Sequence, residues 1–218
     1  MGQVGILKDK IADLSSEIVN AHKTTPARRA LLAGVSGIDG SGKGYVSSKL
    51  AQELRSARVN VAIINADGWL NLPGVRFSTH HAGRHFYENA FRFDEMFGRL
   101  VLPLKRDGSV DVTADLVEET AKDFRQHRYI FDNIDVILLE GIFLFRKQFA
   151  GHFDLRIWIE CSQEVALVRA IKRSQEGLSP IETTHAYNNI YFPAQRIHSI
   201  ADKPTSAAHF IFTNDQNN

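Results

Sequence analysis

A glycine-rich segment, Gly37-Ile38-Asp39-Gly40-Ser41-Gly42-Lys43, constrains this chain more than any other feature. It follows an apolar run, Leu31 to Val35, and precedes a helical pattern from Lys43 to Ala57, so it fits the phosphate-binding pattern G-x-x-x-x-G-K between a strand and a helix. Glycine lets several backbone N–H groups approach phosphate oxygens, while the helix N-terminus and the lysine add positive charge. The alternative is a plain glycine turn. We expect the loop to bind nucleotide phosphates through Gly37, Asp39, Gly40, Ser41, Gly42, Lys43, Gly44 and Tyr45.

Gly44 departs from this pattern. The residue after the lysine is usually Ser or Thr, whose hydroxyl coordinates Mg²⁺, and glycine has no side chain to do so. One explanation is that other groups hold the metal, because Mg²⁺ keeps several waters and needs only one or two carboxylates beside the phosphates. The other is that metal binding and activity are weakened. The groups available for the first explanation include Asp39, Ser41, Asp67 and Glu140.

Alternating strand and helix patterns predict a three-layer α/β domain. The apolar runs expected as buried, mainly parallel strands are Leu31–Val35, Val61–Ile64, Val136–Leu139, Leu155–Ile159 and His209–Thr213. Helical spacing marks Lys43–Ala57, Phe91–Leu102 and Glu164–Arg173, besides a leading helix within residues 1–25. The 218 residues fit one domain, 1–218. Residues 67–134 are too many for a simple crossover, so we expect an insertion there with helices and a small hairpin near Arg106–Ser109.

Composition narrows the partner classes. Hydrophobic residues make up 44% and charged residues 23% of the chain, which is typical of globular proteins. The net charge of +1 gives no reason to expect nucleic acid or an anionic membrane as a partner. Charged residues near the start and the absence of a long apolar run indicate a cytoplasmic protein without a signal peptide or membrane span. We expect small-molecule partners, and a homo-oligomer remains open.

Two carboxylates follow predicted strands. Asp67 comes just after the second strand, and Glu140 ends the third. Strand carboxyl ends in an open parallel sheet form the ligand crevice, next to the phosphate loop. Phosphoryl transfer to an alcohol needs one carboxylate to accept the hydroxyl proton and another to manage magnesium, so Asp67 is the better base and Glu140 the better metal ligand. The alternatives are a loop-capping Asp and a structural Glu.

By order and spacing, the sequence resembles the uridine kinase and phosphoribulokinase group of P-loop small-molecule kinases. The resemblance covers about Leu31 to Thr213. It rests on GVSGIDGSGK at the loop, NADGW after the second strand, FRFDEM at Phe91–Met96, VILLEGIFLF at Val136–Phe145, and Arg169 with Arg173. It implies a P-loop NTPase fold with a five-stranded, mainly parallel sheet, a helical lid over residues 173–191 and an acceptor-site insertion. It also implies use of ATP with Mg²⁺.

The resemblance assigns roles to matching positions. Asp67 matches the catalytic base, and Glu140 the acidic residue near metal and acceptor; Asp67 is also a candidate metal ligand. Lys43, Arg169 and Arg173 would act on the phosphates, although the two arginines could instead form a solvated helix face. Trp69, Phe93 and Asp94 would contact the acceptor, although Phe93 could equally belong to the core.

The acceptor itself stays open. A nucleoside such as uridine or cytidine is favoured, but Gly68-Trp69-Leu70 replaces an aromatic pair found in animal-type uridine kinases, and Glu95-Met96 stands where they have His-Pro. A sugar, sugar phosphate, glycerate or pantothenate is the alternative, and a nucleotide-binding protein without catalysis is a third interpretation. His80, His81 and His85 have a helical metal spacing but no third ligand, so solvated histidines or an acceptor loop are favoured over zinc.

Overall fold

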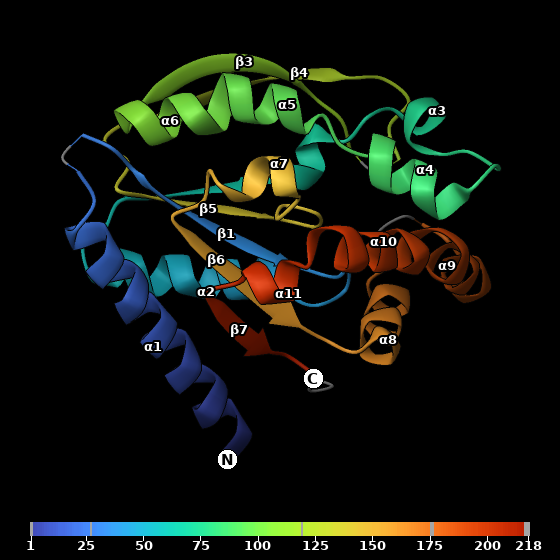
Figure 1. Ribbon diagram of the computed structural model, residues 1–218, viewed down its shortest axis with the longest axis horizontal. Coiled ribbons are helices and arrows are strands. Elements are labelled where there is room, and N and C mark those ends of the chain that lie inside the picture. Colours follow the sequence, from blue (N-terminus) through green and yellow to red (C-terminus); the bar gives the residue numbers. More distant parts are fainter. Residues whose placement is uncertain (1, 27, 119, 175–176, 216–218) are drawn as a thin grey trace.

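A computed structural model describes residues 2–26, 28–118, 120–174 and 177–215, and a five-stranded parallel sheet forms its centre (Figure 1). Each of the five apolar runs forms one strand, and the spatial order is β2, β5, β1, β6, β7. β1 pairs Leu31 with Val136 of β5 on one side and Ala33 with Leu155 of β6 on the other. The strands are β1 (Leu31–Gly37), β2 (Val61–Asn65), β5 (Val136–Gly141), β6 (Leu155–Glu160) and β7 (Phe210–Thr213).

Helices cover both faces of this sheet, so the predicted three-layer α/β architecture is confirmed (Figure 1). α1 (Gly2–Lys23) and α2 (Lys43–Ser56) pack on one face, where Leu50 is buried with Leu31 of β1. The opposite face carries a larger core in which Leu32 of β1 is buried with Phe145. Successive strand residues point to opposite faces, so β1 contributes buried side chains to the cores on both faces of the sheet.

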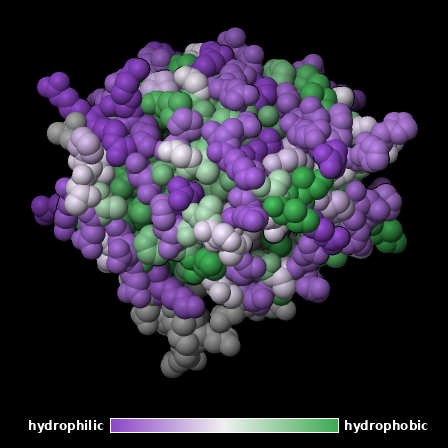
Figure 2. Space-filling model, in the orientation of Figure 1, coloured by the Kyte–Doolittle hydropathy of each residue, from purple (hydrophilic) through white to green (hydrophobic). Residues whose placement is uncertain are grey.

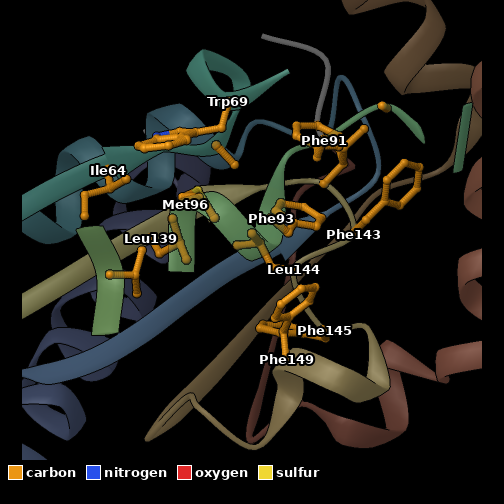
Figure 3. Close-up of a cluster of buried hydrophobic side chains, with 14 of the residues drawn as sticks. Ile64, Trp69, Phe91, Phe93, Met96, Leu139, Phe143, Leu144, Phe145 and Phe149 are labelled. Atoms are coloured by element: carbon orange, nitrogen blue, oxygen red, sulfur yellow. The ribbon is translucent and has the colours of Figure 1, made fainter. Parts of the chain in front are cut away.

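The inserted segment between β2 and β5 forms much of the second face. Its buried side chains include Trp69, Phe93 and Met96, which cluster with Ile64 of β2 and Leu139 of β5 in Figure 3. The elements are a 3₁₀ turn η1 (Ala66–Trp69), α3 (Pro73–Arg76), α4 (Ala82–Asn89), α5 (Phe93–Met96), the π-helical turn η2 (Phe97–Val101), α6 (Leu102–Asp107), β3 (Val110–Leu116) and β4 (Arg125–Phe131).

The helix predicted over Phe91–Leu102 differs in its bounds. It begins at Phe93, widens into the π turn η2 and continues as α6 to Asp107. Pro103 has no N–H to donate to the preceding turn, and a local π turn accommodates that missing bond without ending the helix. The predicted bounds, Phe91 and Leu102, were therefore wrong at both ends.

A small hairpin was expected near Arg106–Ser109, and one is present, since β3 begins at Val110, but the Asp-Gly pair is not its turn. Gly108 has φ 67° and caps the end of α6. β3 and β4 then pair antiparallel from Val110–Phe131 to Leu116–Arg125, so the hairpin turn lies within residues 117–124. The Asp-Gly pair is therefore a left-handed helix cap, since glycine serves both helix ends and turns.

The last third of the chain returns to the sheet through short helices. They are α7 (Lys147–Ala150), α8 (Gln163–Arg173), α9 (Pro180–Ala186), the π turn η3 (Tyr187–Tyr191), α10 (Phe192–Asp202) and α11 (Pro204–Ala207). Ser179 starts α9 with a capping box to Glu182. The predicted lid, 173–191, corresponds to the end of α8, α9 and η3, except for residues 175–176, which lie outside the described residues.

The surface is polar on the face drawn in Figure 2, where hydrophobic side chains form only small scattered groups. Across the described part of the chain, no helix has the length and apolar character needed to cross a membrane.

Candidate active site

The phosphate-binding loop joins β1 to α2. Gly40 and Gly42 have φ 75° and 90°, in the left-handed region that favours glycine. A Cβ on Gly40 would lie 2.5 Å from the carbonyl oxygen of Ala166, and one on Gly42 would strike the amide of Asn214. Both positions therefore favour glycine for backbone conformation, and Gly40 also requires it for space because its neighbour is backbone.

Lys43 opens α2 and points back over this loop. Its side chain is buried, and Nζ donates a hydrogen bond to the carbonyl oxygen of Ile38 at 2.9 Å. Tyr45, in the first turn of the same helix, is half exposed, and the ammonium group of Lys49 lies 5.8 Å from the centre of its ring. The loop thus holds its lysine in a fixed position at the carboxyl ends of the strands.

A pocket lies next to this lysine. Its polar lining consists of the side chains of Asp39, Lys43 and Asp67 and of the buried Arg76. The other walls are apolar or aromatic. They come from Leu70, Phe77, Phe86, Phe91, Ile142 and Tyr191.

Asp67 reaches the pocket from the turn that follows β2. Its backbone N–H donates to Asn65 Oδ1 at 2.7 Å, which starts the 3₁₀ turn and directs the chain across the sheet edge. Burial raises the pKa of Asp67, although Lys43 opposes this, and the negative charge of Asp39 raises it further. Asp67 is therefore a stronger base than a solvated aspartate.

Asp39 behaves differently. Burial alone would raise the pKa of Asp39, but the positive charges of Lys43 and Arg173, together with two hydrogen bonds, lower it overall. The hydroxyl of Tyr187 and the N–H of Gly40 donate hydrogen bonds to its carboxylate, which also favours the charged form. Asp39 therefore stays ionised as a partner of the loop cations.

Glu140 lies at the end of β5, beside both carboxylates. Its side chain is buried, and burial raises the pKa of Glu140 to about 7, with Lys43 opposing and Asp67 adding to the increase. A carboxyl group with this pKa changes its charge near neutral pH, which makes it sensitive to a cation at the site.

The residues around Gly44 fit a magnesium ion. A Cβ at position 44 would lie 3.7 Å from Oε1 of Glu140, so this carboxylate reaches the space that a Ser or Thr side chain would enter. Among the described residues, no three His, Cys, Asp or Glu side chains form a preformed metal cage. Mg²⁺ needs only one or two carboxylates beside phosphates and water, and Glu140 with Asp67 supplies that donor set.

The two arginines of α8 occupy different places. Arg169 Nη1 lies 3.4 Å from the carbonyl oxygen of Ser41 and donates to that of Asn214 at 3.0 Å, so it braces the outer side of the loop. Arg173 Nη2 lies 3.5 Å from Oδ1 of Asp39 and faces the pocket side. Of the two arginines, Arg173 contacts a side chain that lines the pocket, and Arg169 contacts backbone carbonyls.

Three residues predicted to contact the acceptor lie outside the pocket wall. Trp69 is fully buried and stacks on Tyr129, with ring centroids 6.1 Å apart. Phe93 is buried, and its ring stacks parallel to that of Phe91 with centroids 4.8 Å apart. Figure 3 shows the two rings near each other. Asp94 is exposed at the start of α5.

Sequence reasoning missed the aromatic wall and Arg76. Phe91 lies two residues before the predicted Phe93 and takes the pocket position in its place. Tyr191 ends the predicted lid segment, which was a usable signal. Arg76 gives none, since a single arginine in a short segment is normally solvated.

The remaining candidates have structural roles. His85 Nε2 lies 2.8 Å from the carbonyl oxygen of Val75, and the histidines predicted as solvated or loop residues form no metal cluster within the described ranges. Cys161 is buried, and burial raises the pKa of its thiol.

The loop between β1 and α2 carries a buried lysine and lies at the carboxyl ends of the strands, in a parallel sheet with the order β2, β5, β1, β6, β7. This arrangement defines a P-loop nucleotide-binding protein. A model of the phosphoribulokinase / uridine kinase family matches residues 32–179. The chain belongs to this family.

Individual relatives agree with this assignment. A uridine kinase from Limosilactobacillus reuteri is 26% identical over 149 residues, which are 67% of this chain and 66% of the relative's own length. A structure described as a possible uridine kinase from Bacillus stearothermophilus has a TM-score of 0.73 at 20% identity, covering 94% of this chain and 98% of that one. A proposed fructose transport system kinase from Silicibacter sp. TM1040 has a TM-score of 0.74 at 19% identity, covering 93% and 98%. These two structures share the fold.

Proposed function

We propose that this protein transfers the γ-phosphoryl group of ATP to a hydroxyl of a small acceptor, with Asp67 as the general base. The observation that carries the proposal is that Asp67 and Lys43 line one pocket whose remaining walls are mostly apolar. Such a pocket excludes water from the reacting phosphate, which favours transfer to the acceptor over hydrolysis.

Catalysis would consist of positioning and charge stabilisation. Loop N–H groups and the ammonium of Lys43 would bind the phosphates, and Arg173 would stabilise charge on the transferring group. Asp67 would orient the acceptor hydroxyl and accept its proton as the bond to phosphorus forms. Glu140 and Asp67 would hold Mg²⁺, which neutralises charge on the β- and γ-phosphates when bound.

The acceptor we favour is a nucleoside such as uridine or cytidine. Phe77, Phe91 and Tyr191 offer ring faces and edges on the pocket wall, and a planar base packs well against such surfaces. The curated relative from Limosilactobacillus reuteri is a uridine kinase, which supports the same acceptor class.

Arg76 favours a second candidate, an acceptor that carries a carboxylate or a phosphate group. Its side chain is only 4% exposed and lines the same pocket, and its positive charge acts on Asp67. An arginine guanidinium binds carboxylate and phosphate oxygens in a bidentate geometry. Sugar phosphates and glycerate have this chemistry.

One experiment separates these candidates. ADP release from ATP and MgCl₂ by the purified protein is measured with uridine, cytidine, fructose, fructose phosphates and glycerate. We expect uridine or cytidine to stimulate release at least tenfold above hydrolysis without an acceptor. Stimulation by the anionic acceptors alone, lost in Arg76→Gln but kept in Arg84→Gln on exposed α4, would replace the nucleoside with the second candidate. No stimulation by any acceptor, with ATP binding seen as a thermal shift, would contradict catalysis.

A further inference from the structure

A second cavity lies behind the start of the phosphate-binding loop, between β6 and α10. Its walls include Gly37 and Ile38 of the loop, Trp158 of β6, and Gln195 and His198 of α10. It shares no lining residue with the active-site pocket. Its volume of about 350 Å³ far exceeds the space that a single water molecule occupies. We call it the rear pocket.

Gln195 is the most informative side chain of the rear pocket. It is 5% exposed, and within the described part of the chain neither Oε1 nor Nε2 of its amide has a hydrogen-bond partner. A buried amide without partners is unfavourable, and proteins rarely keep one. Because an amide offers one acceptor beside one donor, its complement is a group with a donor beside an acceptor.

His198 presents a second unused atom one helical turn further along. Its Nδ1 lies 2.7 Å from Oδ2 of Asp202, which also accepts from the hydroxyl of Tyr87. The Nδ1 proton is therefore held by the carboxylate, and Nε2 of the neutral ring keeps a lone pair. His198 is 2% exposed, and its Nε2 has no partner among the described residues. It can accept an N–H from a ligand.

The other walls favour a flat, uncharged ligand. Trp158 donates from Nε1 to Oε2 of Glu160 at 2.7 Å, which fixes the indole, and Phe143 adds a second aromatic surface. Glu160 and Arg196 are exposed residues of opposite charge at the rim, so the rim carries no net charge. A carboxylate or phosphate would find no buried cation in this pocket.

We propose that the rear pocket binds an uncharged, nucleobase-like ring with a hydrogen-bond donor beside an acceptor on one edge, held by the Gln195 amide and Nε2 of His198. This site is separate from the site of the transferred phosphate. The two pockets use different residues of the loop, because Asp39 and Lys43 line the active-site pocket, whereas Gly37 and Ile38 line the rear pocket.

The test uses free uracil and free adenine as probes, with binding measured by calorimetry and by saturation-transfer NMR. The full-length protein is saturated with a non-hydrolysable ATP analogue and uridine, which occupy the loop and the active-site pocket. We expect one of the bases still to bind. Gln195→Met, which keeps the side-chain length and removes the amide, should weaken that binding at least tenfold. Ile200→Ala, an exposed position on the same helix, should leave it unchanged.

The Tm of the variants distinguishes a ligand-binding role of Gln195 from a purely structural one. Removing an unpartnered buried amide should leave the Tm of Gln195→Met equal to or above that of the parent. Ser199→Phe, at an exposed lining position, should block the base without touching the buried side chains. A base displaced by the ATP analogue, a base bound equally by Gln195→Met, or no base bound together with a lower Tm for Gln195→Met would each overturn the proposal.

Discussion

The carboxylate of Glu140 faces Gly44 across the mouth of the phosphate-binding loop. A Cβ on Gly44 would lie 3.7 Å from Oε1 and 4.0 Å from Oε2 of Glu140, which is ordinary van der Waals contact. β5 therefore brings a carboxylate to the space where related loops carry a hydroxyl. This relationship makes the missing hydroxyl compatible with magnesium binding.

The first prediction concerns Gly44 itself. Gly44→Ser should fold normally, because the new Cβ meets no atom closer than 3.7 Å. We expect the added hydroxyl to lower the Mg²⁺ concentration needed for half-maximal activity by about two- to tenfold, with kcat changed less than threefold. Gly44→Ala, with the same Cβ and no hydroxyl, is the matched control. A large rescue of a nearly inactive parent would instead show that the natural loop has lost catalysis.

The second prediction concerns the general base. Asp67→Asn keeps the size of the side chain and removes its proton-accepting charge, so kcat should fall by about 10²- to 10⁴-fold. ATP affinity should change little, because the loop and Lys43 hold the phosphates. Turnover is compared with Asp123→Asn in the exposed hairpin turn. Wild-type turnover in Asp67→Asn would remove Asp67 from the role of base.

The third prediction follows from the pKa of about 7 for Glu140, and it concerns activity. Below pH 7 Glu140 is protonated and binds a cation weakly, so the apparent Mg²⁺ affinity should rise with pH between about 6 and 8. Glu140→Gln should remove most of that rise and weaken Mg²⁺ binding, whereas Glu88→Gln on the exposed side of α4 should keep it. A Mg²⁺ affinity with the same pH profile in Glu140→Gln would contradict the assignment.

The same group predicts the pH dependence of stability. Its pKa is raised from 4.5 to about 7 on folding, so the folded protein binds more protons than the unfolded chain between these values. The free energy of unfolding should therefore fall as pH rises from about 4.5 to 7, by at most about 3 kcal/mol from this group. Glu140→Gln should lessen the fall in denaturant titrations. An unchanged slope would show that Glu140 is solvated in solution.

The last prediction separates the two arginines of α8. Arg169 braces the carbonyl of Ser41, so Arg169→Ala should loosen the loop and raise the KM for ATP about tenfold with a smaller effect on kcat. Arg173 faces Asp39 at the pocket, so Arg173→Ala should mainly lower kcat. Equal effects of the two substitutions on both constants would contradict this division of roles.

The fold followed from the sequence because its strongest signals are local. Continuous apolar runs predict buried parallel strands, and the glycine-rich loop with its lysine identifies the joint between β1 and α2. The hairpin turn was misplaced because an Asp-Gly pair suits both a turn and a helix end, and only the pairing of Val110 with Phe131 decides between them.

The site was harder to predict because its walls come from distant segments. Asp67 could be identified from its place after a strand, but the adjacent Trp69 turns into the core while Leu70 faces the pocket. That choice depends on the 3₁₀ turn and on packing against Tyr129. Arg76 ends the four-residue helix α3, and tertiary packing buries it. No spacing rule in the sequence contains that information.

Transfer of label from [γ-³²P]ATP to the acceptor tests the central claim most directly. The wild-type protein and Asp67→Asn are incubated with MgCl₂ and the acceptor that stimulates ADP release, and the phosphorylated product is separated and counted. The predicted result is label on the acceptor hydroxyl with the wild-type protein and at least a hundredfold less with Asp67→Asn. Label released only as inorganic phosphate, or equal transfer by the two proteins, would contradict the account.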